Sequence, residues 1–137
     1  MKRQLVRTAS AFEVSESFAR AVAVGDWIYV SNTSGRNYET KEMSTTLEGQ
    51  TNQALDNISN ALESLGSSLK DVVRRQVVIP RVEDAAAVMA IVGERFRGLS
   101  PTSTVLCSPL GAAHFIVEIE VTAYRGIGDA ETETITI

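Results

Sequence analysis

The segment from Thr45 to Gly66 constrains the fold of this chain more than any other. Its apolar residues recur at the spacing of one helical face. Thr45 and Glu48 have the spacing of a capping box at a helix start, and Gly66 can adopt the left-handed conformation that ends a helix. The apolar face comprises Leu47, Thr51, Ala54, Leu55, Ile58, Ala61, Leu62 and Leu65. The sequence therefore predicts a long helix that buries one face against another layer of structure.

Strand patterns lie on both sides of this helix. A tight turn at Gly25-Asp26 joins two apolar runs and predicts a hairpin. A second helix is predicted over residues 83–98, where Ala85, Val88, Met89, Val92 and Phe96 share a face. The remaining strands are expected at Gln4–Thr8, Asp71–Pro80, Ser103–Ser108 and His114–Tyr124, and residues 9–18 are expected to be irregular.

The last predicted strand alternates apolar and polar side chains. Val117, Ile119, Val121 and Ala123 occupy one set of positions, and Glu118, Glu120, Thr122 and Tyr124 occupy the other, which is typical of a half-buried strand. The order of the elements predicts an α+β fold, a mixed sheet with two helices on one face. Two helices leave the second face uncovered, so we expect a subunit boundary there and a ligand site at that boundary.

Composition limits the class of protein. The 137 residues contain 44% hydrophobic residues, which suits one globular domain over residues 1–125; the segment 126–137 has no packing pattern and is expected to be loose or to dock on a partner subunit. The net charge of −4 weighs against nucleic-acid binding. The single cysteine excludes an intrachain disulfide and fits a reducing, cytoplasmic setting. No segment approaches the roughly 20 apolar residues of a membrane span.

Several motifs are similar to one known family. Four features resemble the Rid family, also called YjgF, YER057c or UK114. They are the segments AVAVGDWIYVSNTSG (residues 21–35), QTNQALDNISNALESLGSSLKDVV (residues 50–73) and VEIEVTAY (residues 117–124), together with Pro101. The resemblance implies a chorismate-mutase-like homotrimer around a central barrel, with ligand clefts between subunits. It further implies hydrolysis of reactive imines and enamines to ketoacids and ammonia, with no cofactor.

One position departs from the family pattern. Well-known members carry Pro-Ala-Arg-Ser/Thr where this chain has Pro101-Thr102-Ser103-Thr104, so the chain resembles the arginine-lacking subgroups, which share the loop motif at Thr33–Tyr38. An arginine grips a carboxylate with two charge-assisted hydrogen bonds, whereas a serine supplies one donor and no charge. We therefore expect weak activity, or an altered substrate range, for imines derived from amino acids.

The resemblance also suggests site residues. Glu120 aligns with an acidic residue of the cleft and is the candidate catalytic group; its alternative is an exposed carboxylate that alternates with Glu118. The candidate substrate-binding residues are Phe18, Arg20, Ser31, Arg36, Ser103 and Cys107. Arg20 or Arg36 would replace the missing anion anchor, unless both are solvated surface residues. Cys107 shares strand parity with Ser103, but no histidine is spaced to activate it, which favours simple packing.

Other candidates are weaker. His114 precedes the last strand, where a turn or interface role is favoured over that of a general base. No cluster of cysteine and histidine predicts a metal site. Two functions remain open: an imine or enamine hydrolase with a different anchor, and a non-catalytic trimer that binds a small ligand. RNA cleavage, which has been attached to some relatives, is the weakest hypothesis because of the acidic charge balance.

Overall fold

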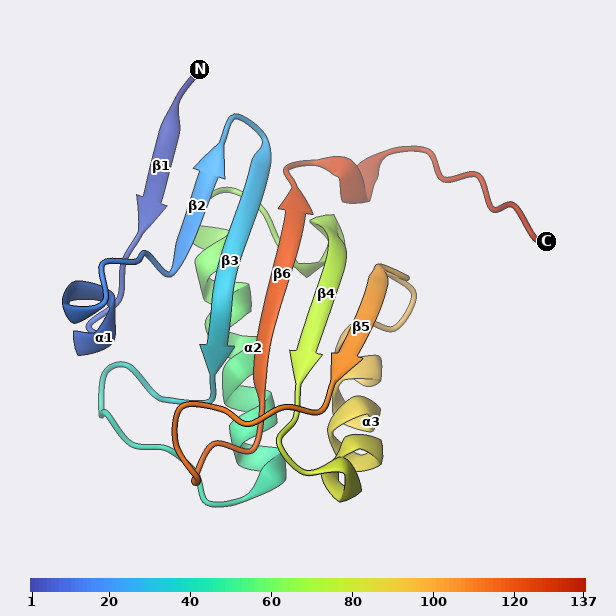
Figure 1. Ribbon diagram of the computed structural model, residues 1–137. Helices are drawn as coiled ribbons and strands as arrows, with labels where there is room; N and C mark the ends of the chain where they lie inside the picture. Colours follow the sequence, from blue (N-terminus) through green and yellow to red (C-terminus); the bar gives the residue numbers. More distant parts are fainter.

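The body of the protein is a six-stranded mixed sheet (Figure 1). The structure is a computed structural model that describes all 137 residues. Its strands follow the spatial order β1-β2-β3-β6-β4-β5; β4 and β5 are parallel, and the other neighbours are antiparallel. The strands are β1 Arg3–Val6, β2 Ala21–Val24, β3 Trp27–Ser34, β4 Val72–Val78, β5 Thr102–Leu106 and β6 Glu118–Tyr124. The predicted α+β class is confirmed.

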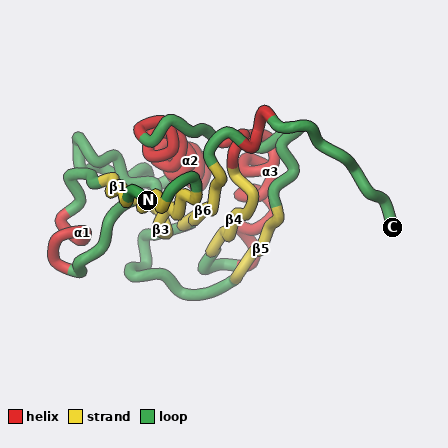
Figure 2. The backbone as a smooth tube through the Cα atoms, turned by 90° about the horizontal axis from the view of Figure 1, so that it is seen from above, coloured by secondary structure: helices red, strands yellow, loops and turns green.

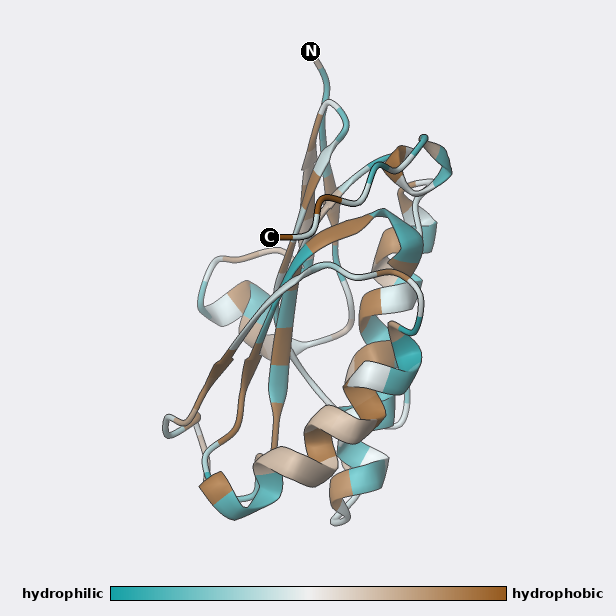
Figure 3. Cartoon of the chain, turned by 90° about the vertical axis from the view of Figure 1, so that its right-hand side faces the viewer, coloured by the Kyte–Doolittle hydropathy of each residue, from teal (hydrophilic) through white to brown (hydrophobic).

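Two helices, α2 (Leu47–Ser64) and α3 (Ala85–Arg95), pack on one face of the sheet, as predicted. Their apolar sides face the strands (Figure 3). The core between these layers includes Ile58 and Leu62 of α2, Val88 and Val92 of α3, and Ile119 of β6. The opposite face of the sheet, which we call the open face, carries no long helix. The strand residues on the open face, about half of the total, are therefore available to contact other molecules.

The ends of α2 follow from local hydrogen bonding. Thr46, and not the predicted Thr45, is the N-terminal cap, because its side-chain oxygen accepts a 3.0 Å bond from the Gly49 N–H. The predicted return bond from Glu48 does not form. At the other end Gly66 has a φ of +72°, and its N–H donates to the Glu63 carbonyl oxygen. The predicted glycine stop is therefore confirmed.

Residues 9–18, which were predicted to be irregular, contain a short helix, α1 (Ala11–Ser15). No side chain caps it. Its anchor is Glu13, which is 1% exposed and accepts a 2.9 Å bond from the Thr8 N–H and another bond from the Thr8 hydroxyl. This prediction was wrong because the bonds between Thr8 and Glu13 stabilise α1. Such polar contacts leave no periodic pattern of apolar residues in the sequence.

The final strand begins later than predicted. β6 starts at Glu118, whereas the sequence pattern placed the start at His114. The buried side chain of Gln50 takes the place of a strand partner: its Nε2 donates to the His114 carbonyl oxygen at 2.9 Å, and its Oε1 accepts from the Ile116 N–H at 2.9 Å. Residues 107–117 consequently form a loop that passes on the side of the sheet away from α2 and α3 (Figure 2).

Two bulges change which side chains face the helices. In β3 the pairing with β6 shifts between Val30 and Thr33, so that both of these residues are buried and Asn32 points elsewhere. In β4 the pairing shifts between Val72 and Arg74. A bulge inserts one residue and reverses the alternation beyond it. Without these shifts the site residues described below would lie on opposite faces of the sheet.

The C-terminal segment begins with a turn that is fixed to the body. Asp71 is buried, and its carboxylate accepts 3.0 and 2.9 Å bonds from the N–H groups of Gly126 and Gly128. Residues 130–137 are exposed and extend away from the sheet (Figure 1). No helix has the length and apolar character needed to cross a membrane.

Candidate functional site

A cavity of about 400 Å³ lies beside α1 at the end of the sheet. We call it the α1 cavity. Four segments form its walls: α1 with the residues that follow it, the end of β3 with its loop, the loop before β6, and the first residue of β6. The lining residues are Ser10, Phe12, Glu16, Phe18, Arg20, Asn32, Ser34, Arg36, Tyr38, Gly111, Ala112, His114, Phe115 and Glu118. The cavity therefore combines aromatic surface with a small number of polar groups, which is typical of small-molecule sites.

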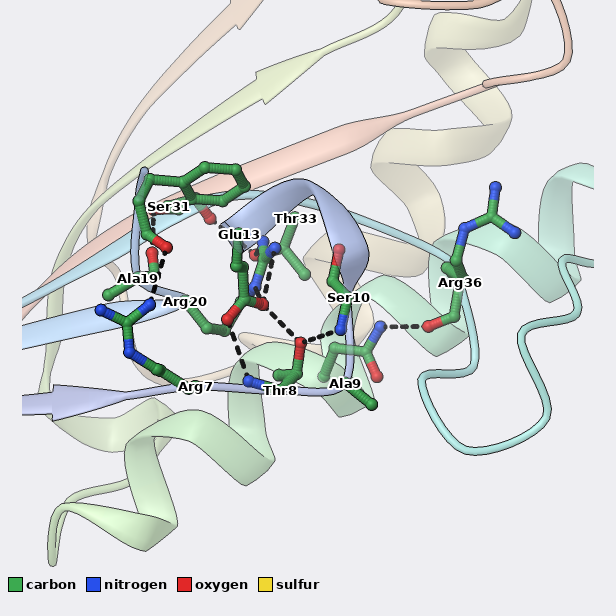
Figure 4. Close-up of polar contacts among 12 residues, drawn as sticks. Arg7, Thr8, Ala9, Ser10, Glu13, Ala19, Arg20, Ser31, Thr33 and Arg36 are labelled. Carbon is green, nitrogen blue, oxygen red and sulfur yellow. Dashed lines mark hydrogen bonds and ion pairs between the residues drawn. The ribbon is translucent and has the colours of Figure 1, made fainter. Parts of the chain in front are cut away.

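The wall at Arg20 is a buried ion pair. Arg20 is 4% exposed and its Nη2 lies 3.3 Å from Glu13 Oε2. Its Nη1 donates to the Asn32 carbonyl oxygen at 3.1 Å and to the Thr33 hydroxyl at 3.2 Å. Figure 4 shows Glu13 held between Thr8 and Arg20. Every nitrogen of this guanidinium that faces the protein already has an acceptor, so Arg20 holds the wall together.

Aromatic rings enclose the same guanidinium. The Cζ atom of Arg20 lies 5.4 Å from the ring centroid of Phe18 and 5.3 Å from that of Tyr38. Such cation–π contacts are worth about 0.5–2 kcal/mol, more when the pair is desolvated. Glu13 holds Arg20 in place, and Arg20 in turn holds the two rings in position on the cavity wall.

Helix α2 positions the loop segments of the cavity. The Asn57 side-chain amide donates to the carbonyl oxygens of Ser34 and Arg36 at 3.1 and 2.8 Å. Gly35 lies against the backbone of Gln50, where an added Cβ atom would be only 2.3 Å from the Gln50 carbonyl oxygen. Only glycine fits this close approach. Buried polar residues on the apolar face of α2 thus fix both loops that line the cavity.

Glu118 is the carboxyl group of the cavity. It is half-buried, and its Oε1 accepts a 3.3 Å bond from the Asn32 side-chain amide. Burial raises the pKa of Glu118, and the positive charge of Arg20 opposes this rise. The raised pKa extends the range in which Glu118 can carry a proton. A carboxyl group with a raised pKa is a candidate for donating and accepting a proton in a reaction.

Two polar atoms beside the cavity lack hydrogen-bond partners. They are the side-chain oxygen of Asn32 and the hydroxyl of Tyr38. Burial raises the pKa of Tyr38, with Arg20 again opposing, so the hydroxyl keeps its proton. A buried polar atom without a partner costs about 1–3 kcal/mol. These two atoms therefore have free hydrogen-bonding capacity next to Glu118.

Some of the sequence-predicted site residues meet at this cavity. Phe18, Arg20 and Arg36 line it. Arg36 donates from Nη1 to the Lys41 carbonyl oxygen at 2.8 Å and lies to the side of the Glu13–Arg20 pair in Figure 4. Ser31 does not line the cavity; its hydroxyl donates to the Ala19 carbonyl oxygen at 2.8 Å.

The other predicted residues lie elsewhere. Ser103 is exposed on β5, where its hydroxyl accepts a 3.1 Å bond from Arg75 Nε. Cys107 is exposed just after β5, with its thiol 3.4 Å from the Pro80 carbonyl oxygen. Glu120 accepts a 2.8 Å bond from the Gln76 amide and does not line the cavity. Within one chain the predicted site therefore divides into two groups.

The residues that sequence reasoning missed are Glu118, Asn32 and Tyr38. Glu118 and Glu120 have the same strand parity, so alternation alone does not distinguish them. Only Glu118 lies at the strand start, beside the end of β3. Asn32 points to Glu118 because of the bulge in β3, and no sequence signal marks that bulge. No group of three His, Cys, Asp or Glu side chains is arranged to hold a metal ion.

Comparison with known proteins identifies the fold and the family. The family model described as Endoribonuclease L-PSP matches residues 8–125. The uncharacterized protein SCO2049 of Streptomyces coelicolor is 30% identical over 126 residues, which are 91% of this chain and 94% of the relative. A 2-iminobutanoate/2-iminopropanoate deaminase of Dermatophagoides farinae is 27% identical over 76% of this chain and 82% of its own length.

A solved structure agrees with these sequence matches. The crystal structure of Rv2704 from Mycobacterium tuberculosis, a member of the YjgF/YER057c/UK114 family, has a TM-score of 0.81 and 29% identity, and the match covers 90% of this chain and 99% of that one. The predicted resemblance is confirmed on both sequence and structure. This chain belongs to the Rid (YjgF/YER057c/UK114) family.

Proposed function

We propose that this protein hydrolyses a small imine or enamine in the α1 cavity and that Glu118 is the group that moves the proton. The observation that carries the proposal is a carboxyl group with a raised pKa inside a partly aromatic cavity. A relative named as an imine deaminase supports the reaction class. The absence of an arginine at position 103 leads us to expect an altered substrate range.

The reaction needs two protons to pass from oxygen to nitrogen. Water adds to the imine carbon, so that a C–O bond forms while the C=N bond becomes a single bond. Glu118 donates a proton to the nitrogen and receives one from the attacking water. In the second step Glu118 again gives a proton to the nitrogen and takes the hydroxyl proton of the carbinolamine. The C–N bond breaks as the C=O bond forms, which releases ammonia and a ketone. The Asn32 side-chain amide donates to Glu118 Oε1 and so helps to hold the carboxyl group in position for these transfers.

We further propose that the working form is a homotrimer with this site at subunit boundaries. Ser103 and Cys107, which one chain keeps apart from the α1 cavity, would then approach the cavity of a neighbouring chain. The open face also carries exposed apolar residues, including Trp27 at 44% and Tyr29 at 50% exposure. Exposed aromatic surface of this kind favours association. Light scattering should give about three times the 14.8 kDa of one chain.

The test compares two carboxylates on the same strand. The imines of pyruvate and 2-oxobutanoate are generated in situ by an amino-acid oxidase, and ammonia release is measured. We expect Glu118→Gln to lower turnover about 100-fold or more, in line with general acid–base contributions of about 10²–10⁴. The matched control is Glu120→Gln, which lies on the same face two residues away and should retain turnover. The reverse result would assign the role to Glu120.

The second candidate is a trimer that binds a small ligand without transforming it. The exposed Ser103 favours it, because a serine is a poor replacement for a carboxylate-binding arginine. A wild-type protein that leaves imine decay unchanged, but retains a bound metabolite through purification, would support this candidate over hydrolysis.

A further inference from the structure

The bulge in β4 gives Arg75 an unusual position. Arg74 pairs with Thr122, a residue of the open face, and Arg75 pairs with the buried Val121. Strict alternation from the buried Val72 would have put Arg74, and not Arg75, on the helix side. The bulge therefore turns Arg75 toward α3, where its Cζ atom lies 5.0 Å from the ring centroid of Phe96.

The neighbouring strand fixes the same guanidinium. Arg75 and Ser103 are direct partners in the parallel pair β4–β5, and Arg75 Nε donates to the Ser103 hydroxyl at 3.1 Å. The Phe96 ring and the Ser103 hydroxyl together hold the side chain in one orientation. This leaves Nη1 and Nη2 without an acceptor in the chain. Two adjacent N–H groups of a fixed guanidinium match the two oxygens of a carboxylate.

Arg75 also lacks a carboxylate partner. Arg20, Arg81, Arg95, Arg97 and Arg125 form ion pairs, and the other five arginines form none. Of those five, only Arg36 and Arg75 are half-buried. Burial lowers the pKa of Arg75, and no nearby acid compensates for the lost hydration. A partly buried cation without a counter-charge in the chain can accept an anion as its partner.

Ser103 adds a third donor. A hydroxyl has one proton and can accept through its lone pairs. The Ser103 oxygen accepts from Arg75, and its own proton finds no acceptor in the chain. That proton can therefore point to the same anion as Nη1 and Nη2. Neither residue lines the α1 cavity.

From these contacts we propose that Arg75 and Ser103 form a binding site for a small carboxylate at the β4–β5 edge. Arg75 supplies two parallel N–H donors, and Ser103 supplies one O–H donor. The site provides a guanidinium beside position 103, which was predicted to bind substrate. We expect the carboxylate to belong to an imine formed from an amino acid, and this identity rests on the proposed function. Binding of a carboxylate does not itself require hydrolysis.

Pyruvate titration at low salt tests this site by calorimetry. The wild type should bind saturably, and Arg75→Gln should weaken binding at least tenfold, since a charged hydrogen bond is lost. Arg75→Lys should retain part of the affinity, and Ser103→Ala should weaken it a few-fold. Arg74→Gln is the matched control, because Arg74 is exposed on the other face and bonds only to Gln76; its affinity should stay within twofold of the wild type.

A second measurement does not depend on any variant. In wild-type protein the Nε–Hε resonance of Arg75 should shift with pyruvate concentration along the calorimetric binding curve. An unmoved resonance, or wild-type affinity in Arg75→Gln, would overturn the proposal. If the wild type binds pyruvate but releases no ammonia from imines, the proposed function fails and the carboxylate site stands.

Discussion

Arg20 is buried and Arg75 is partly buried, and their surroundings differ further. Arg20 is 4% exposed, and Glu13, the Asn32 carbonyl and the Thr33 hydroxyl accept its hydrogen bonds. Arg75 is half-buried, and Ser103 is its one acceptor. Both lie against aromatic rings. The chain satisfies the hydrogen bonds of the Arg20 guanidinium, whereas Arg75 retains N–H donors that a ligand can use.

The difference indicates that Arg20 has a structural role and that Arg75 has a ligand-binding role. A buried cation is stable only when its charge and its hydrogen bonds are met, and Arg20 meets this condition inside the protein. We therefore assign Arg20 to holding Phe18 and Tyr38 in place, although it was first considered as an anion anchor. Arg75 differs, because its Nη1 and Nη2 have no acceptor in the chain. Its contacts with Phe96 and Ser103 make it the better anchor.

The largest expected effect comes from breaking the Glu13–Arg20 pair. Glu13→Gln or Arg20→Met leaves one buried charge without its partner, which typically costs about 3–5 kcal/mol. Urea unfolding should show this loss in the free energy of unfolding. The exposed Arg74→Gln is the control and should change it by less than about 0.5 kcal/mol.

The double variant sharpens that result. Glu13→Gln combined with Arg20→Met removes both charges, so it should cost less than the sum of the single changes. Additive losses would mean that the two residues stabilise the protein separately, and Arg20 would then be free to serve a ligand as Arg75 does.

The sequence predicts the layers of this fold well. The apolar stripes of residues 45–66 and 85–96 and the alternation in β6 depend on local periodicity, which the structure follows. The site depends on individual polar contacts, which do not repeat at a regular spacing in the sequence. Gln50 and Asn57 sit on the buried face of α2 and hold distant loops by their amides. Their residue types alone do not reveal which carbonyl groups they reach.

The two bulges produce contacts that the sequence pattern does not predict. Each inserts one residue into a strand and changes the facing of the side chains beyond it. Asn32 therefore meets Glu118, and Arg75 meets Ser103. Glu118 and Glu120 have equal strand parity, so alternation alone does not predict which of the two carboxyl groups lies beside the end of β3.

Asp71 offers a third way to satisfy a buried charge, with no cation as a main partner. Burial opposes its ionisation, but the N–H groups of Gly126 and Gly128 and the Ser67 hydroxyl hold its pKa below the usual value. Asp71→Asn replaces one acceptor oxygen by a donor, and should cost about 1–3 kcal/mol. Urea unfolding at pH 7 measures this loss.

The pH dependence gives the sign of the Asp71 contribution. A lowered folded-state pKa stabilises the protein above the unfolded pKa, and this stability is lost as pH falls through the folded pKa. The gap in unfolding free energy between wild type and Asp71→Asn should therefore shrink on acidification. A gap that stays constant down to pH 2 would assign the loss to shape and not to charge.

Glu118 should behave in the opposite way. Its folded-state pKa is raised, so its contribution to stability is present below the unfolded pKa and is lost as pH rises through the folded pKa. Thermal melts should show the stability of Glu118→Gln increasing relative to that of the wild type as pH rises above the usual pKa of a glutamate side chain. The gain should stay below about 1 kcal/mol, because the group is partly exposed and solvent screens it. In an Arg20→Met background the opposing positive charge is absent, so the gain should increase.

The smallest expected effect belongs to Arg75, and it completes the comparison with Arg20. Arg75→Met keeps an unbranched apolar side chain over Phe96 but removes the charge and the bond to Ser103. The lost cation–π contact and hydrogen bond are offset by relief of a desolvated charge that has no acid partner in the chain. We therefore expect the free energy of unfolding to change by less than about 0.5 kcal/mol, roughly a tenth of the change for Arg20→Met. Urea unfolding of the two variants side by side, at low salt and without added carboxylate, measures this ratio. Adding pyruvate should then stabilise the wild type and leave Arg75→Met unchanged, because only a ligand that binds the folded state raises its stability. A loss of several kcal/mol in Arg75→Met without any ligand would show that Arg75, like Arg20, is a structural residue.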